Sequence, residues 1–152
     1  MKPSRHIIAS ACIGGALAFF TKSVYAGIIC FASGIFVDFD HVIEYIIHHK
    51  WKNLSFRNVY YMSEQTSKGE NGEGFKKLYL VFHIGEIALL LWVAAIYTKN
   101  IYLLAISLGY SAHIVMDSIG NTMEPAGYFV LWRAMNKFDT ERLMKKGLRI
   151  KD

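Results

Sequence analysis

The chain has 152 residues, of which 53% are hydrophobic, 14% aromatic and only 19% charged, and its formal net charge is +5 at pH 7. This composition is too apolar for an ordinary soluble domain of this size and predicts one compact domain embedded in a membrane. A nucleic-acid-binding protein would need a soluble basic face, which such a chain does not offer. Cys12 and Cys30 lie inside apolar runs without a CxxC spacing, which argues against a disulfide framework or a cysteine zinc site.

Four apolar segments follow one another along the chain. Residues 7–20 and 25–37 are short for a membrane span of about 20 residues and would borrow flanking turns. Residues 78–97 and 101–119 reach the length that is needed to cross the hydrocarbon core. We therefore predict an all-α integral membrane bundle of about four transmembrane helices. Small residues in the first two segments would let those helices approach closely: Gly14, Gly15, Ala16, Gly27, Ala32, Ser33 and Gly34.

Two polar stretches complete the expected architecture. Residues 50–77 contain SKGENGEG and are predicted as a loop. Residues 128–152 mix aromatic side chains with Arg and Lys, which is typical of an interfacial amphipathic helix, and Trp132 with Arg133 would anchor it to the membrane. We expect residues 1–127 to form the bundle, with its loop at 50–77, and residues 128–152 to form a basic interfacial tail.

The N-terminus also resembles a secretory signal. Lys2 and Arg5 precede an apolar core, and Val24-Tyr25-Ala26 would be the cleavage site. The immediate return to apolar sequence at Gly27 argues against cleavage.

The basic residues set the expected orientation. Nearly all of them lie before the first segment, in residues 50–77 and in the tail, whereas the two opposite connections carry only Lys22 and Lys99. The positive-inside rule then places both termini and the central loop in the cytoplasm. We expect a protein of the plasma (inner) membrane.

Ionisable residues gather at the cytoplasmic level of this expected bundle. His6 precedes the first helix, and the sequence VDFDH closes the second. His83 and His113 would lie roughly 8–9 Å inside the third and fourth helices, at 1.5 Å per residue. Asp117 follows His113 by four residues, on the same helix face. Because such residues cost several kcal/mol inside a membrane, they are read as functional.

Imidazole nitrogen together with carboxylate oxygen is the donor set that zinc, manganese or iron takes in helical bundles. We predict a divalent metal site, with zinc preferred, and draw its ligands from His6, Asp38, Asp40, His41, His83, His113 and Asp117.

Structural alternatives remain for several of these residues. Asp38 or Asp40 could cap the helix that begins near His41, and His6 could be interfacial. His48 and His49 are expected at a helix C-terminus, where they favour the helix dipole. Glu86 would share a helix face with His83 at i+3, as a general base or as a group that orients the imidazole.

The early His, the DFDH element, the His entering the third segment and the stretch GYSAHIVMDSIGNTMEPAGYFVLW resemble the membrane-bound metal-dependent hydrolases of the YdjM type. Their pattern is also similar to that of zinc-dependent phospholipase C. The chain departs from the family pattern in having Val37 before Asp-x-Asp-His and Ile84 after His83, and it lacks an Arg-Gly-x-Thr element. The resemblance implies a membrane-embedded hydrolase.

Residues and resemblance together predict metal-dependent hydrolysis of an ester or phosphoester, with a membrane lipid as the substrate. Glu86 is expected to act as the general base. Two other classes of function compete with this one. His83 and His113 could be axial ligands of a haem in an electron-transfer module. The cluster could also be a structural metal site, or part of an ion path, in a scaffold protein without catalysis.

The charge distribution predicts that residues 50–77 face the cytoplasm. A Glu70→Cys variant should therefore stay unlabelled when intact cells are treated with a thiol reagent that does not cross membranes. Labelling after the cells are opened is the positive control. Labelling of residue 70 from outside the cell would refute this topology.

Overall fold

The computed structural model describes residues 3–68 and 74–145. These residues are mainly helical and include no β-strand, so the all-α prediction is confirmed for this part of the chain. The elements are α1 (Pro3–Thr21), α2 (Val24–Phe36), the 3-10 helix η1 (Val37–Phe39), α3 (Asp40–His49), α4 (Phe56–Lys68), α5 (Gly85–Thr98), α6 (Ile101–Gly120), the 3-10 helix η2 (Pro125–Tyr128), α7 (Val130–Met135) and α8 (Thr140–Leu143).

Three helical stretches are long and apolar enough to cross a membrane. They are Pro3–Thr21, Val24–His49 and Ile101–Gly120, with mean hydropathies of 1.2, 1.6 and 1.3. The second of them joins α2, η1 and α3 into 26 continuous residues. Helix α5 is apolar but has only 14 residues, which is short for a span. The predicted number of four spans is therefore not confirmed.

The third apolar segment is helical over only part of its predicted length. Residues 78–84 form an irregular stretch, and α5 begins at Gly85. His83 thus precedes the helix, and the prediction that it shares a helix face with Glu86 is wrong. The physical reason is that side chains from α3 bind the N–H groups of this stretch, which therefore need no helical partners.

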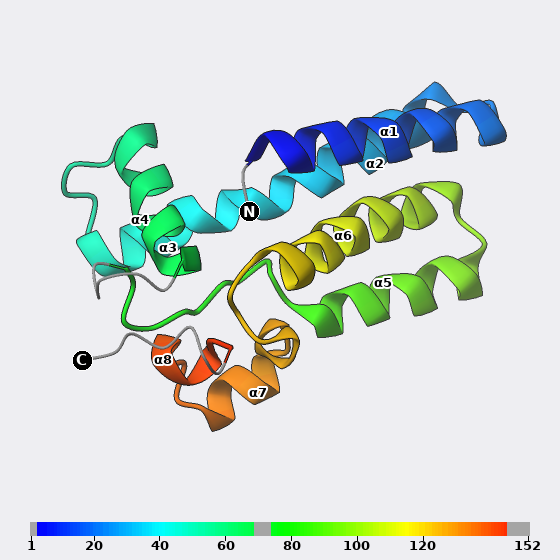
Figure 1. The fold of residues 1–152 in the computed structure, drawn as a ribbon. Helices are drawn as coiled ribbons and strands as arrows, with labels where there is room; N and C mark the ends of the chain where they lie inside the picture. The colour runs from blue at the N-terminus through cyan, green and yellow to red at the C-terminus, as the bar shows by residue number, and fades with distance from the viewer. Residues whose placement is uncertain (1–2, 69–73, 146–152) are drawn as a thin grey trace.

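Helices α1, α2, α5 and α6 run side by side as a bundle (Figure 1). Backbones come close where small residues meet. A Cβ atom on Gly14 would lie 2.6 Å from the Gly27 carbonyl oxygen, and one on Gly109 would lie 2.1 Å from the Cys30 carbonyl oxygen. The predicted close approach of the first two helices is therefore confirmed, and α6 approaches α2 in the same way.

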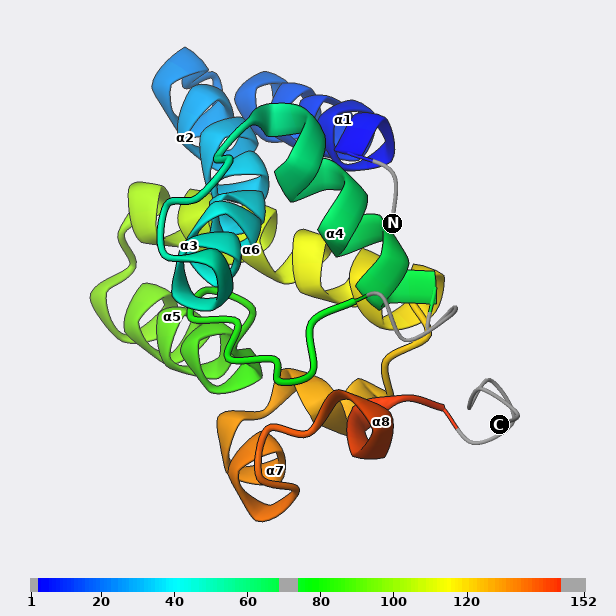
Figure 2. The same ribbon diagram turned by 90° about the vertical axis from the view of Figure 1, so that its left-hand side faces the viewer.

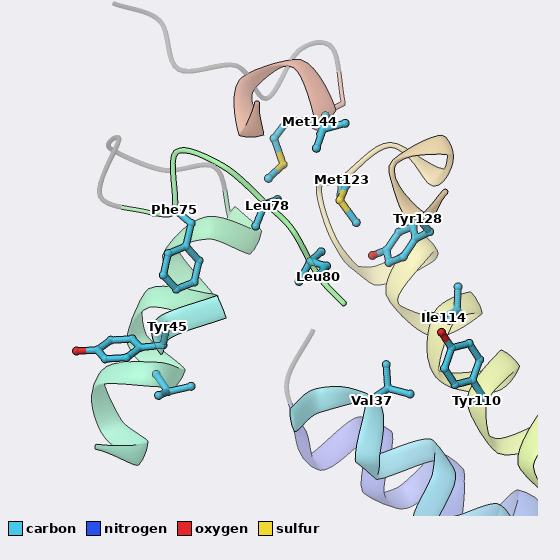
Figure 3. Close-up of a cluster of buried hydrophobic side chains, with 12 residues drawn as sticks. Val37, Tyr45, Phe75, Leu78, Leu80, Tyr110, Ile114, Met123, Tyr128 and Met144 are labelled. Atoms are coloured by element: carbon cyan, nitrogen blue, oxygen red, sulfur yellow. The ribbon is translucent and has the colours of Figure 1, made fainter. Parts of the chain in front are cut away.

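The remaining elements form a cap at one end of the bundle, where α3, α4, α7 and α8 lie (Figures 1 and 2). Helix α4 lies within the predicted loop 50–77, so the loop prediction is wrong for Phe56–Lys68. This helix packs on the cap core through Val59, which is buried. Residues 69–73, within SKGENGEG, lie outside the described residues. Figure 3 shows the apolar core under the cap, where Tyr45, Phe75, Leu78, Leu80, Met123, Tyr128 and Met144 converge.

The C-terminal tail is not one amphipathic helix within the described residues. Two short helices, α7 and α8, are separated by Lys137 and Phe138, which have φ of 57° and 56° and thus interrupt the helix. Arg133 is fully buried, so its predicted role as a membrane anchor is wrong, whereas Trp132 is 41% exposed. Residues 146–152 lie outside the described residues.

The close contact of α6 with α2 gives a stability prediction. Gly109→Ala should lower the melting temperature of the detergent-purified protein, because the added methyl group would overlap backbone and cost about 1–3 kcal/mol. Gly15→Ala is the matched control, since a Cβ there meets nothing within 4 Å. An equal melting temperature for the two variants would contradict this packing.

Candidate metal centre

Six of the predicted ligands come together where the bundle meets the cap. Their donor atoms form three overlapping groups, in each of which all atoms lie within 4.8 Å of one another. The groups are His6, Asp38 and His113; then Asp38, His41 and His83; and then His83, His113 and Asp117. These clusters could hold a metal ion.

Separate parts of the chain supply these side chains. His6 lies in the first turns of α1, Asp38 in η1 and His41 at the start of α3. His83 ends the irregular stretch before α5, and α6 carries His113 and Asp117 one turn apart. The site therefore depends on the packing of the whole bundle.

Asp117 lies among the buried histidines of the candidate metal centre. Its Oδ1 lies 3.1 Å from Nε2 of His6, and its Oδ2 lies 3.1 Å from Nε2 of His83 and 3.4 Å from Nε2 of His113. The ring of His6 also stacks on that of His113, with centroids 4.0 Å apart. Three imidazoles thus direct the same ring atom toward one carboxylate.

Asp38 and His41 form the open edge of the centre. Asp38 Oδ1 lies 3.5 Å from Nε2 of His113 and 3.6 Å from Nε2 of His41. The side chains of Asp38 and His41 are 25% and 33% exposed, whereas those of His83 and Asp117 are 2% and 3% exposed. A molecule from outside would therefore meet Asp38 and His41 before the other donors.

Hydrogen bonds on the far side of two rings set their orientation. Nδ1 of His113 lies 2.6 Å from the Gly34 carbonyl oxygen, and Nδ1 of His83 lies 3.0 Å from Oδ2 of Asp40. Both partners are acceptors, so each Nδ1 carries the proton. In the neutral form of each ring, Nε2 then carries the lone pair and directs it toward the centre. A histidine held in this way by a carbonyl or carboxylate is the usual arrangement at metal sites.

Two of the donor atoms are spaced as ligands of one metal ion would be. The Nε2 atoms of His83 and His113 are 3.2 Å apart. Two ligand atoms of a tetrahedral zinc ion, with bonds of 2.0–2.1 Å, lie about 3.3 Å from each other. Two lone pairs at this distance repel unless a proton or a metal ion lies between them.

His83 shows how strongly the site favours positive charge. Burial disfavours its charged form, but hydrogen bonds with Asp117 and Asp40 outweigh this effect and raise the pKa of His83 to about 9. Without a metal ion this imidazole would carry a second proton at neutral pH. A metal ion would replace that proton.

Asp40, which was predicted as a ligand, is in none of the three groups. Its fully buried carboxylate accepts from the N–H groups of Val81, Phe82 and His83 at 2.8, 2.9 and 3.0 Å, besides its contact with the His83 ring. Its oxygens are therefore directed at the irregular stretch. Asp40 positions His83, and Asp38 is the aspartate of the VDFDH element that joins the donor groups.

Glu44 continues this pattern one helical turn later. Its carboxylate accepts from the N–H groups of Tyr79, at 3.0 Å, and Leu80, also at 3.0 Å. Two carboxylates of α3 thus bind five consecutive N–H groups of the irregular stretch. His48 contacts Glu44 at 3.2 Å, and Nδ1 of His49 contacts the Tyr45 carbonyl oxygen at 3.3 Å. Neither histidine is in a donor group, in agreement with the helix-end role expected for them.

Arg133 binds the carbonyl side of the same stretch, a role that the sequence analysis missed. Its guanidinium donates to the carbonyl oxygens of Tyr79, Leu80 and His83, the last two at 2.9 and 3.2 Å. Burial lowers the pKa of the Arg133 guanidinium, while Asp40 opposes that shift. The sequence signal for this buried role is a single arginine within the apolar run YFVLWRAM.

Glu86, the predicted general base, lies outside the donor groups. Its carboxylate accepts from the N–H groups of Val130 and Leu131 at 3.1 and 3.3 Å, at the start of α7. This contact satisfies the N-terminus of a short helix. The geometry therefore supports a role for Glu86 in positioning α7, next to Arg133, rather than in proton transfer.

Comparisons of the chain with protein-family models, curated proteins and solved structures found no match.

The orientation of His113 predicts its importance for metal binding. His113→Ala should lower the metal content of the purified protein strongly, because a buried site loses a ligand that belongs to two of the donor groups. His49→Ala is the control and should leave the metal content unchanged. Elemental analysis of both variants measures the effect, and equal metal content in wild type and His113→Ala would refute the assignment.

Proposed function

We propose that this protein is a metal-dependent hydrolase that cleaves an ester or phosphoester at the membrane surface. The observation that carries the proposal is the open edge of the donor cluster, where Asp38 and His41 are accessible beside otherwise buried donors. A purely structural metal site would be closed by its ligands, whereas a catalytic site keeps a position for water or substrate.

Zinc is the ion that the donors suit best, with manganese or iron as alternatives. Six side chains exceed the four ligands of one tetrahedral ion, and Asp38 and His113 each belong to two groups. This arrangement supports two ions that share ligands. The chemistry that such ions supply is polarisation of a phosphoryl or carbonyl oxygen and acidification of a water molecule.

The protein's own residues would hold and orient this chemistry. Asp40 keeps the His83 ring in one orientation, and the Gly34 carbonyl does the same for His113. Asp117 keeps three imidazoles together in a water-poor environment. The substrate would approach past Asp38 and His41.

A membrane lipid is the proposed substrate, because apolar side chains surround the centre on the outside. Phe36 and Phe39 flank Asp38 and are 58% and 54% exposed, Val81 near His83 is 43% exposed, and Ile119 near Asp117 is 77% exposed. Such exposed apolar surface at the level of the site fits contact with lipid. We propose that this end of the bundle lies at the cytoplasmic leaflet, as the charge distribution predicts.

The geometry argues against the haem alternative. Axial histidines of a haem bind from opposite faces of the porphyrin, whereas Asp117 contacts the Nε2 atoms of both His83 and His113, which lie 3.2 Å apart.

The test is hydrolysis by detergent-purified protein with added zinc or manganese, using phospholipid vesicles and bis-p-nitrophenyl phosphate as probes. Asp38→Asn should reduce turnover by 100-fold or more, on the order of what one electrostatic catalytic group contributes. The Asp38→Asn protein should remain folded, since Asp38 is partly exposed. His49→Ala should keep full activity. Metal bound without any hydrolysis would favour the structural or ion-path alternative.

A further inference from the structure

A pocket in the cap lies beside the open edge of the candidate metal centre, because the two share His41. His41 lines both, since its Nε2 contacts Asp38 and its ring forms part of the pocket wall. The other walls come from Glu44 of α3, from α4, from residues 75–80 and from Asn121, Met123 and Met144. We refer to it as the cap pocket.

The lining of the cap pocket is mostly apolar. Phe75, Leu78, Leu80, Met123 and Met144 supply most of its surface, and Met144 and Met123 come together through an antiparallel backbone bridge. Methionine side chains are flexible and adapt to the shape of an apolar group. The pocket therefore favours binding of an apolar group over water.

Most polar groups of the lining are already engaged. Glu44 binds the backbone of Tyr79 and Leu80, and the hydroxyl of Thr66 donates to the Met62 carbonyl oxygen and accepts from the Phe75 N–H. Ser63 is different, because its Oγ is shielded from solvent and has no hydrogen-bond partner among the described residues. A buried hydroxyl without a partner is costly, and a ligand oxygen would satisfy it.

The size of the pocket limits its occupant. The cavity volume of about 40 Å³ gives room for roughly three or four water-sized groups. A chain of three or four heavy atoms fits this room, and a bulky ring does not.

We propose that the cap pocket is the subsite for the alcohol part of the substrate, a short alkyl or hydroxyalkyl group joined to the phosphoryl group at the metal centre. Ser63 donates a hydrogen bond to an oxygen on that group. This proposal rests on the proposed function, because it assumes that a phosphoryl group binds beside His41. It adds the chemical class of the group next to the bond that is cleaved.

Binding of substrate-like phosphates tests the proposal without catalysis. Isothermal titration calorimetry on the metal-loaded protein in detergent should show that propyl phosphate binds about fifteenfold more tightly than methyl phosphate, since each of its two additional buried methylenes contributes about fourfold. Ser63→Leu fills the pocket and should abolish this preference while methyl phosphate still binds. Tyr60→Leu, on the same helix but outside the pocket lining, should keep the preference.

The hydroxyl of Ser63 is tested separately. Ser63→Ala should weaken binding of 3-hydroxypropyl phosphate by about two- to tenfold, the range of one hydrogen bond, and should change the affinity for propyl phosphate by less than about twofold. Equal effects on the two ligands would overturn the role of Ser63.

The outcomes separate this proposal from the proposed function. If methyl phosphate binds and propyl phosphate gains nothing, or if the gain survives in Ser63→Leu, the subsite is overturned while the metal centre stands. If the metal-loaded protein binds neither phosphate, the subsite is overturned together with the phosphoester form of the proposed function.

Discussion

The structure depends on how the irregular stretch before α5 satisfies its backbone. A buried non-helical chain cannot leave its N–H and C=O groups without partners, because neither the protein interior nor lipid offers water to satisfy them. Asp40 and Glu44 accept from five consecutive N–H groups of this stretch, and Arg133 donates to three of its carbonyl oxygens. The two carboxylates and the guanidinium also offset one another's charge. The chain can therefore remain extended where helix would otherwise form.

This arrangement has a direct consequence for the metal centre. Because His83 is not part of a helix, its ring can reach Asp117 on α6 while its Nδ1 stays on Asp40. If His83 were part of α5, the helix geometry would fix the direction of its side chain. The cap also helps to position His83, because the guanidinium of Arg133 on α7 donates a hydrogen bond to the His83 carbonyl oxygen.

Hydrophobicity and charge were sufficient to predict an all-helical chain and the gathering of His6, Asp38, His41, His83, His113 and Asp117 at one level. They failed for residues 78–84, because this run is as apolar as a buried helix and its partners lie 35 to 54 positions away in the sequence. For the same reason, local composition predicts a membrane anchor at Arg133. A span can be predicted from local composition, but an extended stretch held by distant side chains cannot.

The two aspartates of VDFDH show why neither could be assigned from the motif. Residues two apart on a helical turn point about 200° away from each other, so only one of them can face a given neighbour. Asp40 faces the irregular stretch and is fully buried, whereas Asp38 faces His41 and His113 and is partly exposed. The motif thus divides its two carboxylates between the irregular stretch and the candidate metal centre. Asp40 orients His83 on the buried side of the centre, and Asp38 lies on the side that is open to solvent.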